Sequence, residues 1–410
     1  MGVGIEAINI YAGRASLDVR QLFQARGLDM QRFSNLMMVQ KSVNLPCEDP
    51  VTNAVNAAKP LIDALSPEER DRIELVIVGT ESGLDYAKPI STYIHEYLGL
   101  SRRCRSFETK HACYGGTAAF QMAASFVAAS AIPGLKALVI AAEAASVADR
   151  SSYWEPSQGA GAVSMLVSDR PNIFELDPGA NGYYTYEVMD TLRPRPDLEA
   201  GDTDLSLLSY LECLQKSYEF YRERVAGADI VATFDYLVFH SPFAGMVKGA
   251  HRTMLRRQHS MRPELIERDF DARMAPSLIY CSRIGNMYSA SLYAAVCSLI
   301  DHTEFLTPKR IGLFSYGSGC ASEFYSGVVP EGAREKLARL QIGAAIDSRR
   351  ALTMDEYELV SDLSVDRMGG VKEKVFDTSP YRAAYDACLA GQGLLVLDRV
   401  ANFHRQYRWS

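Results

Sequence analysis

Apolar strands that lead into loops or helices of small residues recur in both halves of this 410-residue chain. The first half contains three such segments, and the second half repeats the rhythm. The expected strands lie at residues 72–79, 104–109, 137–142, 234–240, 279–282 and 310–315. Continuous apolar strands that alternate with helices are typical of sheets covered on both faces. The pattern therefore predicts an α/β fold built on a duplicated plan.

The two halves also correspond in detail. The segments at 109–127 and 282–300 both place a polar or reactive residue just before a helix of small residues. We predict an N-terminal half at 1–170 and a C-terminal half at 171–410, with no linker that would separate independent domains. In such folds, ligands collect beyond the carboxyl ends of the strands. The residues at those strand ends are therefore the candidates for a functional site.

A polar insertion at about 183–226 interrupts the second half. It is rich in Tyr, Asp and Arg. Within it, the sequence RPRPDLEAGDTD at 193–204 predicts a polar loop, and residues 205–222 predict a helix.

Composition excludes several classes of protein. The chain is 48% hydrophobic, which is unlike a disordered segment. Its net charge of −7 gives no reason to expect a nucleic-acid partner. No uninterrupted apolar stretch is long enough to cross a bilayer, and the first residues do not resemble a signal peptide, so we expect a cytoplasmic protein without a membrane partner. The eight cysteines form no CxxC pair, and we expect neither disulfides nor a metal site.

Five features follow the expected strands: Glu81, Cys113, His240, Asn286 and the turn at 317–319. A cysteine at the start of a helix lies in the positive end of the helix dipole, which is expected to lower its pKa. A histidine and an asparagine can hydrogen-bond a thioester carbonyl, and a carboxylate can remove a proton from the carbon next to it. This combination suits carbon–carbon bond formation better than hydrolysis.

Each of these residues also has a purely structural interpretation. Cys113 has small neighbours and could be a packed core thiol. His240 could be a structural histidine, and Glu81 could cap a helix. Asn286 follows a glycine and could adopt a left-handed turn conformation. The residues alone leave these alternatives open.

Six motifs, taken together and in order, resemble the 3-hydroxy-3-methylglutaryl-CoA synthase family of the thiolase superfamily. They are ESGLD at 81–85, HACYGG at 111–116, EPSQGAGAV at 155–163, FHSPF at 239–243, GN at 285–286 and LFSYGSG at 313–319. The resemblance covers most of the chain. It implies a thiolase-like fold of two related halves in a five-layered αβαβα arrangement, normally in a homodimer.

The resemblance also implies a role for each residue. Cys113 would be the nucleophile that accepts an acetyl group from a thioester, and Glu81 would deprotonate that group to an enolate. His240 would polarise or protonate the β-carbonyl of the acceptor, with Asn286 hydrogen-bonding nearby. The backbone amides of Cys113 and Ser318 would form the oxyanion hole. Water would then release the product from Cys113.

The opening segment at 4–29 and the block at 179–214 resemble most closely the synthase homologues of polyketide β-branching. This implies an acyltransferase that takes acetyl, or propionyl, from a donor acyl carrier protein. The acceptor would be a β-ketoacyl intermediate on a polyketide synthase carrier protein. Phosphopantetheine would then be the substrate carrier, and no permanently bound cofactor is expected.

Three alternatives remain beside this interpretation. The nearest is the CoA-dependent enzyme of mevalonate biosynthesis. Another is a different thiolase-superfamily enzyme, such as a thiolase or an initiating ketoacyl synthase, although these lack the glutamate. The third is a non-catalytic scaffold that only docks carrier proteins.

A basic stretch follows His240 on this otherwise acidic chain. Its cationic side chains are Lys248, His251, Arg252, Arg256, Arg257 and Arg262. Such a rim would attract an acidic carrier protein or the phosphate of phosphopantetheine. An ordinary solvated helix face is the alternative, and CoA also carries phosphates.

One departure from the family pattern occurs at Glu143-Ala144, where the family usually shows an Asp-Ile pair. In the family, this loop lines the acyl end of the pocket. We therefore expect the departure to affect the choice of acyl group, acetyl or larger, and the order of the loop at 143–155. We expect it to leave the catalytic positions untouched.

Overall fold

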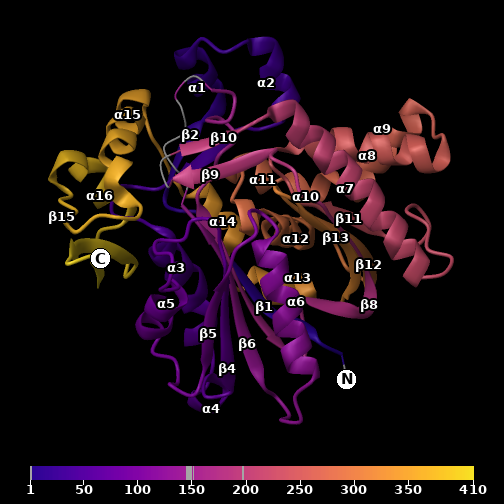
Figure 1. The fold of residues 1–410 in the computed structure, drawn as a ribbon, viewed down its shortest axis with the longest axis horizontal. Coiled ribbons are helices and arrows are strands. Elements are labelled where there is room, and N and C mark those ends of the chain that lie inside the picture. Colours follow the sequence, from indigo (N-terminus) through magenta and orange to yellow (C-terminus); the bar gives the residue numbers. More distant parts are fainter. Residues whose placement is uncertain (1, 145–149, 151, 196–197) are drawn as a thin grey trace.

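A nine-stranded mixed sheet organises the molecule (Figure 1). The structure is a computed structural model that describes residues 2–144, 150, 152–195 and 198–410. The strands, in spatial order, are β11 (Tyr236–Phe239), β12 (Lys309–Gly317), β13 (Ala321–Val329), β8 (Phe174–Thr185), β1 (Gly4–Tyr11), β7 (Gly161–Ser168), β6 (Lys136–Glu143), β4 (Ile73–Gly79) and β5 (Arg105–Thr109).

The sheet consists of two half-sheets that are joined by a short ladder between β1 and β8, at Gly4–Glu175 and Ile5–Phe174. Strands β4, β5 and β6 run parallel to one another, as do β11 and β12. The residues of β4, β6, β11 and β12 are largely buried, as their apolar sequences predict, whereas β5 is only partly buried. Four of the five candidate site residues, Glu81, Cys113, His240 and Ser318, follow the carboxyl ends of these parallel strands, whereas Asn286 follows the short helix at Cys281–Ile284.

Helices α3 (Pro50–Asp63) and α6 (Gly115–Ala128) cover opposite faces of the first half-sheet. Helix α3 begins at the capping box of Asp49 and Thr52, with Pro50 at its first position. It packs on β1, β6 and β7, whereas α6 packs on β4, β5, β6 and β7. Helix α5 (Ser91–Tyr97) lies beside α3 on the outer face.

The second half repeats this arrangement. Helices α7 (Thr203–Arg224) and α8 (Ala244–His259) form its outer layer, and α12 (Ser291–Asp301) packs on the inner face of β11 and β12. Helices α6 and α12 meet in the centre, where the Phe120 and Tyr293 ring centroids are 5.8 Å apart. Outer helices, half-sheet, central helices, half-sheet and outer helices make five layers, with separate apolar clusters on the outer and central sides.

The insertion at 183–226 differs from its sequence prediction. Residues expected to form a loop instead contribute to an antiparallel pair of strands, β9 (Thr191–Arg195) and β10 (Leu198–Gly201). Residues 196–197 lie outside the described residues. The predicted helix at 205–222 is present as α7. The loop prediction was wrong because prolines and charges resemble a turn locally, whereas cross-strand pairing and tertiary packing fix the hairpin.

The strand expected at 279–282 was also wrong. The structure places two short helices there, α10 (Ala275–Leu278) and α11 (Cys281–Ile284). A short apolar segment does not distinguish a buried strand from a buried helical turn by its periodicity. The short helix η1 (Tyr288–Ala290) then leads into α12.

The segment after residue 350 packs against the first half rather than the second (Figure 1). The Leu397 amide donates to the Cys47 carbonyl oxygen over 2.8 Å, and Arg405 pairs with Asp49. The remaining elements are β2 (Ala15–Asp18), α1 (Val19–Arg26), α2 (Met30–Leu36), β3 (Gln40–Val43), α4 (Pro67–Arg70), α9 (Pro263–Arg273), α13 (Ala333–Ala338), α14 (Ile342–Asp347), β14 (Arg350–Ala351), α15 (Met354–Leu363), η2 (Val365–Arg367), β15 (Glu373–Val375), η3 (Ser379–Tyr381), α16 (Arg382–Cys388), β16 (Leu395–Ala401) and β17 (His404–Trp409).

Candidate active site

Glu81 and Cys113 lie next to each other at the carboxyl ends of two parallel strands. Gly79 at the end of β4 pairs with Thr109 at the end of β5, so the segments that follow the two strands leave the same edge of the sheet. The Cys113 Sγ atom is 3.9 Å from Glu81 Oε2. The structure therefore brings together a thiol and a carboxylate that are 32 residues apart in sequence.

Cys113 lies in a tight turn between β5 and α6. The preceding Ala112 has a φ of 41°, in the left-handed region, and the Tyr114 amide donates to the His111 carbonyl oxygen over 3.0 Å. The end of β12 packs directly against this turn, because a side-chain carbon on Gly317 would lie only 2.5 Å from the His111 carbonyl oxygen. This close approach places the turn that contains Ser318 beside the turn that contains Cys113.

The Ser318 turn is anchored by Asp190, a buried residue that the sequence did not single out. Asp190 Oδ1 accepts a hydrogen bond from the Gly319 amide over 2.9 Å, and Oδ2 accepts one from the Tyr316 hydroxyl over 2.5 Å. The carboxylate thus fixes both sides of Ser318.

Glu81 is held by an arginine that was also not predicted to belong to the site. Arg193 Nη2 lies 3.1 Å from Glu81 Oε1 and 3.4 Å from Glu199 Oε2. Burial raises the pKa of Glu81 to about 8; Arg193 opposes this rise, whereas Glu143 and Glu199 add to it. Glu81 is therefore poised to exchange a proton near neutral pH.

The pKa of Cys113 is raised well above its ordinary value, and not lowered as expected from its place before a helix. Burial is the largest cause, followed by the negative charges of Glu81, Glu143 and Glu199. These influences outweigh the helix dipole, so the resting site holds a neutral thiol that faces the Glu81 carboxyl group.

Glu143 contacts the proposed catalytic positions directly, contrary to the expectation that its departure from the family pattern would leave them untouched. Its carboxylate accepts hydrogen bonds from the Glu81 amide over 3.1 Å, the Ser82 hydroxyl over 2.6 Å and the Ser289 hydroxyl. Glu143 thereby supports the backbone that carries Glu81. The expected order of the loop at 143–155 concerns residues 145–149 and 151, which lie outside the described residues.

His240 follows β11 and is 1% exposed. Its amide donates to the Phe314 carbonyl oxygen over 2.8 Å, so it leaves the sheet beside β12, the strand that ends at the Ser318 turn. Within the described part of the chain, its buried Nδ1 atom has no hydrogen-bond partner. Burial lowers the pKa of His240 to about 3, which makes the ring neutral at physiological pH.

Asn286 has an oriented side chain. Its Oδ1 atom accepts hydrogen bonds from the Tyr288 amide over 2.8 Å and the Ser291 hydroxyl over 2.9 Å. Occupation of the oxygen leaves the NH₂ group as the end that can donate to a ligand. The left-handed conformation belongs to Gly285, with a φ of 89°, and not to Asn286.

The basic stretch lies on α8, except for Arg262, which precedes α9, and its charge is partly neutralised. His251 is buried, with Nε2 2.7 Å from Asp269 Oδ1. Lys248 and Arg252 both form ion pairs with Glu267 of α9, at 2.6 and 2.9 Å. Arg256 is exposed, and Arg257 donates to Gln215 on the neighbouring helix α7. His251 therefore does not belong to the expected surface rim.

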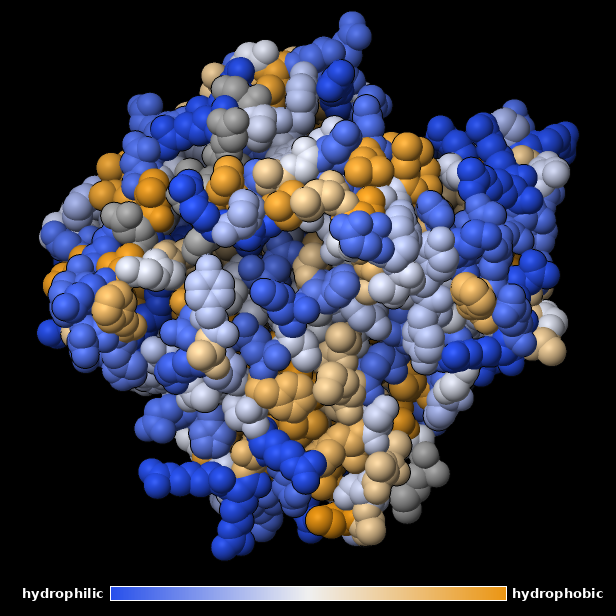
Figure 2. Space-filling model, in the orientation of Figure 1, coloured by the Kyte–Doolittle hydropathy of each residue, from blue (hydrophilic) through white to orange (hydrophobic). Residues whose placement is uncertain are grey.

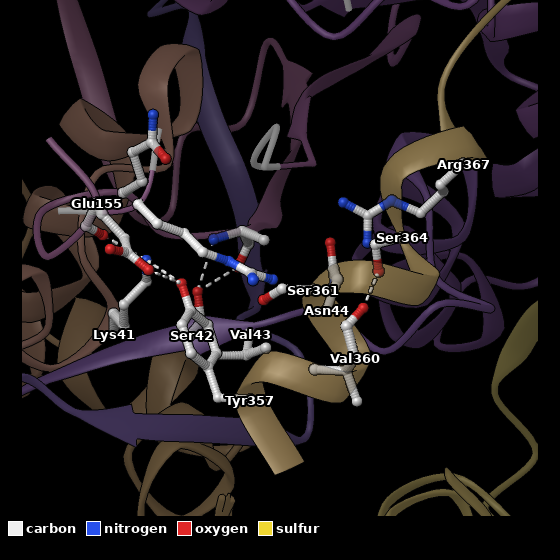
Figure 3. A pocket seen from close by; sticks show the side chains of 13 residues that line it. Lys41, Ser42, Val43, Asn44, Glu155, Tyr357, Val360, Ser361, Ser364 and Arg367 are labelled. Atoms are coloured by element: carbon white, nitrogen blue, oxygen red, sulfur yellow. Dashed lines mark hydrogen bonds between the residues drawn. The ribbon is translucent and has the colours of Figure 1, made fainter. Parts of the chain in front are cut away.

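A separate polar cavity of about 50 Å³ lies between β3 and α15 (Figure 3). There the Tyr357 hydroxyl donates to Glu155 Oε1 over 3.1 Å, and Lys41 donates to the Glu155 carbonyl oxygen. Gln158 lines this cavity and donates to Glu199 over 2.8 Å. None of the five residues predicted for catalysis lines the cavity.

Known proteins resemble the chain over its full length. Residues 1–172 match the model of the hydroxymethylglutaryl-coenzyme A synthase N-terminal region, and residues 175–268 and 256–407 match that of the C-terminal region. The chain belongs to the hydroxymethylglutaryl-coenzyme A synthase family. The family membership suggested by the six motifs is thereby confirmed.

Three relatives show the range of this family. The polyketide biosynthesis 3-hydroxy-3-methylglutaryl-ACP synthase PksG of Bacillus subtilis is 51% identical over 100% of this chain and 99% of its own length. The hydroxymethylglutaryl-CoA synthase of Enterococcus faecalis is 37% identical over 87% of this chain and 91% of its own. A crystal structure of the curacin pathway HMG synthase with acetyl donor-ACP matches with a TM-score of 0.97, at 52% identity and full coverage of both chains. These matches confirm the thiolase-like fold.

The described residues contain neither a metal-binding cluster nor a membrane-spanning helix. Among the described residues, no group of three or more His, Cys, Asp or Glu side chains is arranged to hold a metal ion. In the same part of the chain, no helix is both long and apolar enough to span a membrane.

Proposed function

We propose that this family member condenses an acyl group held on Cys113 with a β-ketoacyl thioester, and that both substrates arrive on acyl carrier proteins during polyketide β-branching. The 3.9 Å approach of the Glu81 carboxylate to the Cys113 sulfur carries the proposal. It places a proton acceptor beside the atom that would hold the acyl group. An acyl group attached there would expose its α-carbon to a base.

The first step is acyl transfer to Cys113. The sulfur attacks the carbonyl carbon of an acetyl thioester, and the carrier thiol leaves with the proton that Cys113 gives up. The Cys113 and Ser318 amides lie on two turns that pack together, and they would stabilise the oxyanion by about 3–4 kcal/mol per donor. Asp190 supports this arrangement by fixing the Ser318 turn.

The second step forms the carbon–carbon bond. Glu81 removes a proton from the acetyl methyl group, and the resulting enolate attacks the β-carbonyl carbon of the acceptor. His240, with its depressed pKa, acts as a neutral hydrogen-bond donor that polarises this carbonyl, and Asn286 donates nearby. Water then hydrolyses the bond to Cys113 and releases a 3-hydroxy-3-carboxymethyl acyl chain on the acceptor carrier.

Relatives support carrier proteins over free CoA as substrates. PksG is named as an HMG-ACP synthase, and the curacin HMG synthase binds its donor-ACP. Phosphopantetheine on the carriers would deliver the acyl groups. The exposed cations of α8, chiefly Arg256 and Arg257, support an acidic partner near this face. We take acetyl as the donor group, with propionyl as the alternative.

A homodimer fits one uncovered region of the molecule. Strand β5 forms an edge of the nine-stranded sheet, so its outer backbone groups are available to another strand. Figure 2 shows apolar surface over the neighbouring helix α6, where Met122 is 48% exposed. Two copies that pair through β5 and α6 would cover both features. Light scattering during size-exclusion chromatography should give the mass of a dimer, and a monomer mass would contradict this pairing.

A turnover comparison tests the choice of substrate. Acetyl and acetoacetyl groups are presented on carrier proteins or on CoA, and product formation is followed by mass spectrometry. We expect efficient turnover of the carrier-bound pair only. Equally efficient turnover of the CoA pair would contradict the carrier assignment and favour the CoA-dependent reaction of the Enterococcus relative.

A further inference from the structure

A compact cluster of buried charges surrounds Glu81. Three carboxylates, Glu81, Glu143 and Glu199, lie around one guanidinium group, that of Arg193. Arg193 contacts Glu81 at 3.1 Å and Glu199 at 3.4 Å, and its side chain is only 11% exposed. Buried carboxylates take up protons unless a cation compensates for the lost hydration. Arg193 is therefore placed to control the charge of its neighbours.

Neighbouring residues hold the Arg193 side chain in place. It projects from β9, and its guanidinium lies 5.0 Å from the centroid of the Tyr288 ring. Glu199, on the partner strand β10, accepts hydrogen bonds from Gln158 over 2.8 Å and from the Tyr288 hydroxyl over 3.3 Å. These contacts fix Glu199, and Glu199 in turn orients the guanidinium.

We infer that Arg193 is a positioning residue for the condensation step, which holds the Glu81 carboxyl group against Cys113 and favours its ionised form. This inference rests on the proposed role of Glu81 as the base. It assigns the β9–β10 hairpin a part in catalysis that neither its composition nor the names of the relatives indicate. Arg193 acts through Glu81, whose Oε1 atom it contacts.

The transfer of the proton explains why Arg193 needs a second carboxylate partner beside Glu81. When Glu81 takes the methyl proton, the C–H bond breaks, an O–H bond forms on the carboxyl group, and the electron pair remains on the enolate. Glu81 then becomes neutral and its attraction to Arg193 falls. Glu199 continues to neutralise Arg193, so no buried cation is left unpaired. The same carboxyl group can later release its proton beside the same cation.

Single-turnover condensation from preformed acetyl-enzyme tests the inference. The rate is measured against pH for the wild type, Arg193→Met, Arg193→Lys and the control Arg195→Met, which changes an exposed arginine on the same strand. Among the described residues, the charged or titratable groups that act on Glu81 besides Arg193 are Glu143, Glu199, Cys113 and Tyr288. All four are unchanged in these variants.

In Arg193→Met, the midpoint of the rising limb should move upward by about one pH unit or more, with a roughly tenfold lower rate at neutral pH. Arg193→Lys should restore much of the midpoint, and Arg195→Met should match the wild type. An unchanged midpoint in Arg193→Met would overturn the inference, even if the rate falls. Acetylation of Cys113, read by intact mass, should persist and shows that the site remains assembled.

Glu199→Gln supplies a second test that does not depend on the folding of the first variant. The glutamine can still accept from Arg193, but it removes a negative charge that raises the pKa of Glu81. The midpoint should therefore move downward, opposite to Arg193→Met, and no shift would overturn the inference. The variant Glu81→Gln separates a failure of this inference from a failure of the proposed function. If Glu81→Gln still condenses, Glu81 is not the base, whatever the effect of the Arg193 variants.

Discussion

Burial governs proton affinity at three residues of the candidate site. It is the first cause of the raised pKa values of Glu81 and Cys113 and of the lowered pKa of His240. All three shifts disfavour the charged form. Burial therefore favours the neutral form at each of these three positions. Such a site suits a reaction whose charges develop only after the acyl group is bound.

Glu81→Gln tests the proposed role of Glu81 as the base of the condensation. The amide keeps the size of the side chain but cannot accept the methyl proton, so we expect condensation to fall by about 100-fold or more. Acetylation of Cys113 should remain, because the nucleophile and the Ser318 turn are unchanged. Rapid quenching and mass spectrometry separate the two steps. Condensation at the wild-type rate would contradict the role of Glu81.

His240 should also make stability depend on pH. Its pKa falls from 6.5 in the unfolded chain to about 3 in the folded protein, so the unfolded state binds more protons between these values. Stability is therefore lost as the pH drops from 6.5 toward 3, with a slope of about 1.4 kcal/mol per pH unit from this group. Denaturant unfolding of His240→Gln should show a shallower acid limb. An identical limb in both proteins would contradict the neutral, buried histidine.

The sequence predicted the residues that carry recognisable chemistry, and not those that adjust it. Cys113 and Glu81 follow strands and belong to motifs, and the structure brings them together. Arg193 and Glu199 lie in a stretch whose prolines suggest a loop, so nothing local pointed to a buried ion pair. Their contacts form across the molecule, and the burial that reverses the expected pKa shift of Cys113 is equally non-local.

At the scale of elements, the packing of α6 against η1 depends on a glycine. A side-chain carbon on Gly116 would lie 2.3 Å from the Ser289 carbonyl oxygen, although Ser289 is 173 residues away in sequence. The contact holds the first turn of α6, and thus the Cys113 turn, against the second half. Gly182 makes a similar approach between β8 and α7.

Replacing Gly116 by alanine should therefore destabilise the protein by about 1–3 kcal/mol, although alanine normally favours a helix. Gly249→Ala in α8 is the matched control, because nothing lies within 4 Å of its added carbon. That variant should be as stable as the wild type or more stable by up to about 1 kcal/mol. Urea unfolding measures both. Equal stability of the two variants would contradict the close packing at Gly116.

The strands and helices with long, regular patterns were predictable, whereas short elements were not. Strands β4, β5, β6, β11 and β12 lie where apolar segments were expected. The segment at 279–282 was assigned to the wrong class, because a few apolar residues satisfy either a strand or a helical turn. The β9–β10 hairpin was missed because its proline and charged residues resemble a loop locally, whereas the pairing of the two strands is a tertiary feature.

At the scale of the whole molecule, the C-terminal segment packs against the first half. The duplicated plan predicted from the sequence did not indicate this contact. Arg405 on β17 forms a buried ion pair with Asp49 at 2.9 Å, and the Tyr407 hydroxyl donates to the same carboxylate over 2.8 Å. Asp49 also caps α3. One carboxylate thus joins the last strand of the chain to a helix of the first half.

Asp49→Ala should lower the free energy of unfolding by about 3–5 kcal/mol, because it leaves a buried arginine without its partner. Asp63→Ala provides the control, since Asp63 is 53% exposed and pairs with Lys59 on the surface. Its loss should cost about 1 kcal/mol or less. Denaturant unfolding of both variants checks this contrast. A small effect of Asp49→Ala would show that the C-terminal segment is not anchored in this way.

The central claim is that Cys113 carries the acyl group delivered by a carrier protein. Intact-protein mass spectrometry after mixing with acetyl donor carrier protein tests it most directly, with Cys113→Ser as the matched variant. We expect one acetyl adduct on the wild type, mapped to Cys113 by peptide analysis, absent from Cys113→Ser and discharged when acceptor carrier is added. No adduct on the wild type, or an adduct that persists in Cys113→Ser, would contradict the account.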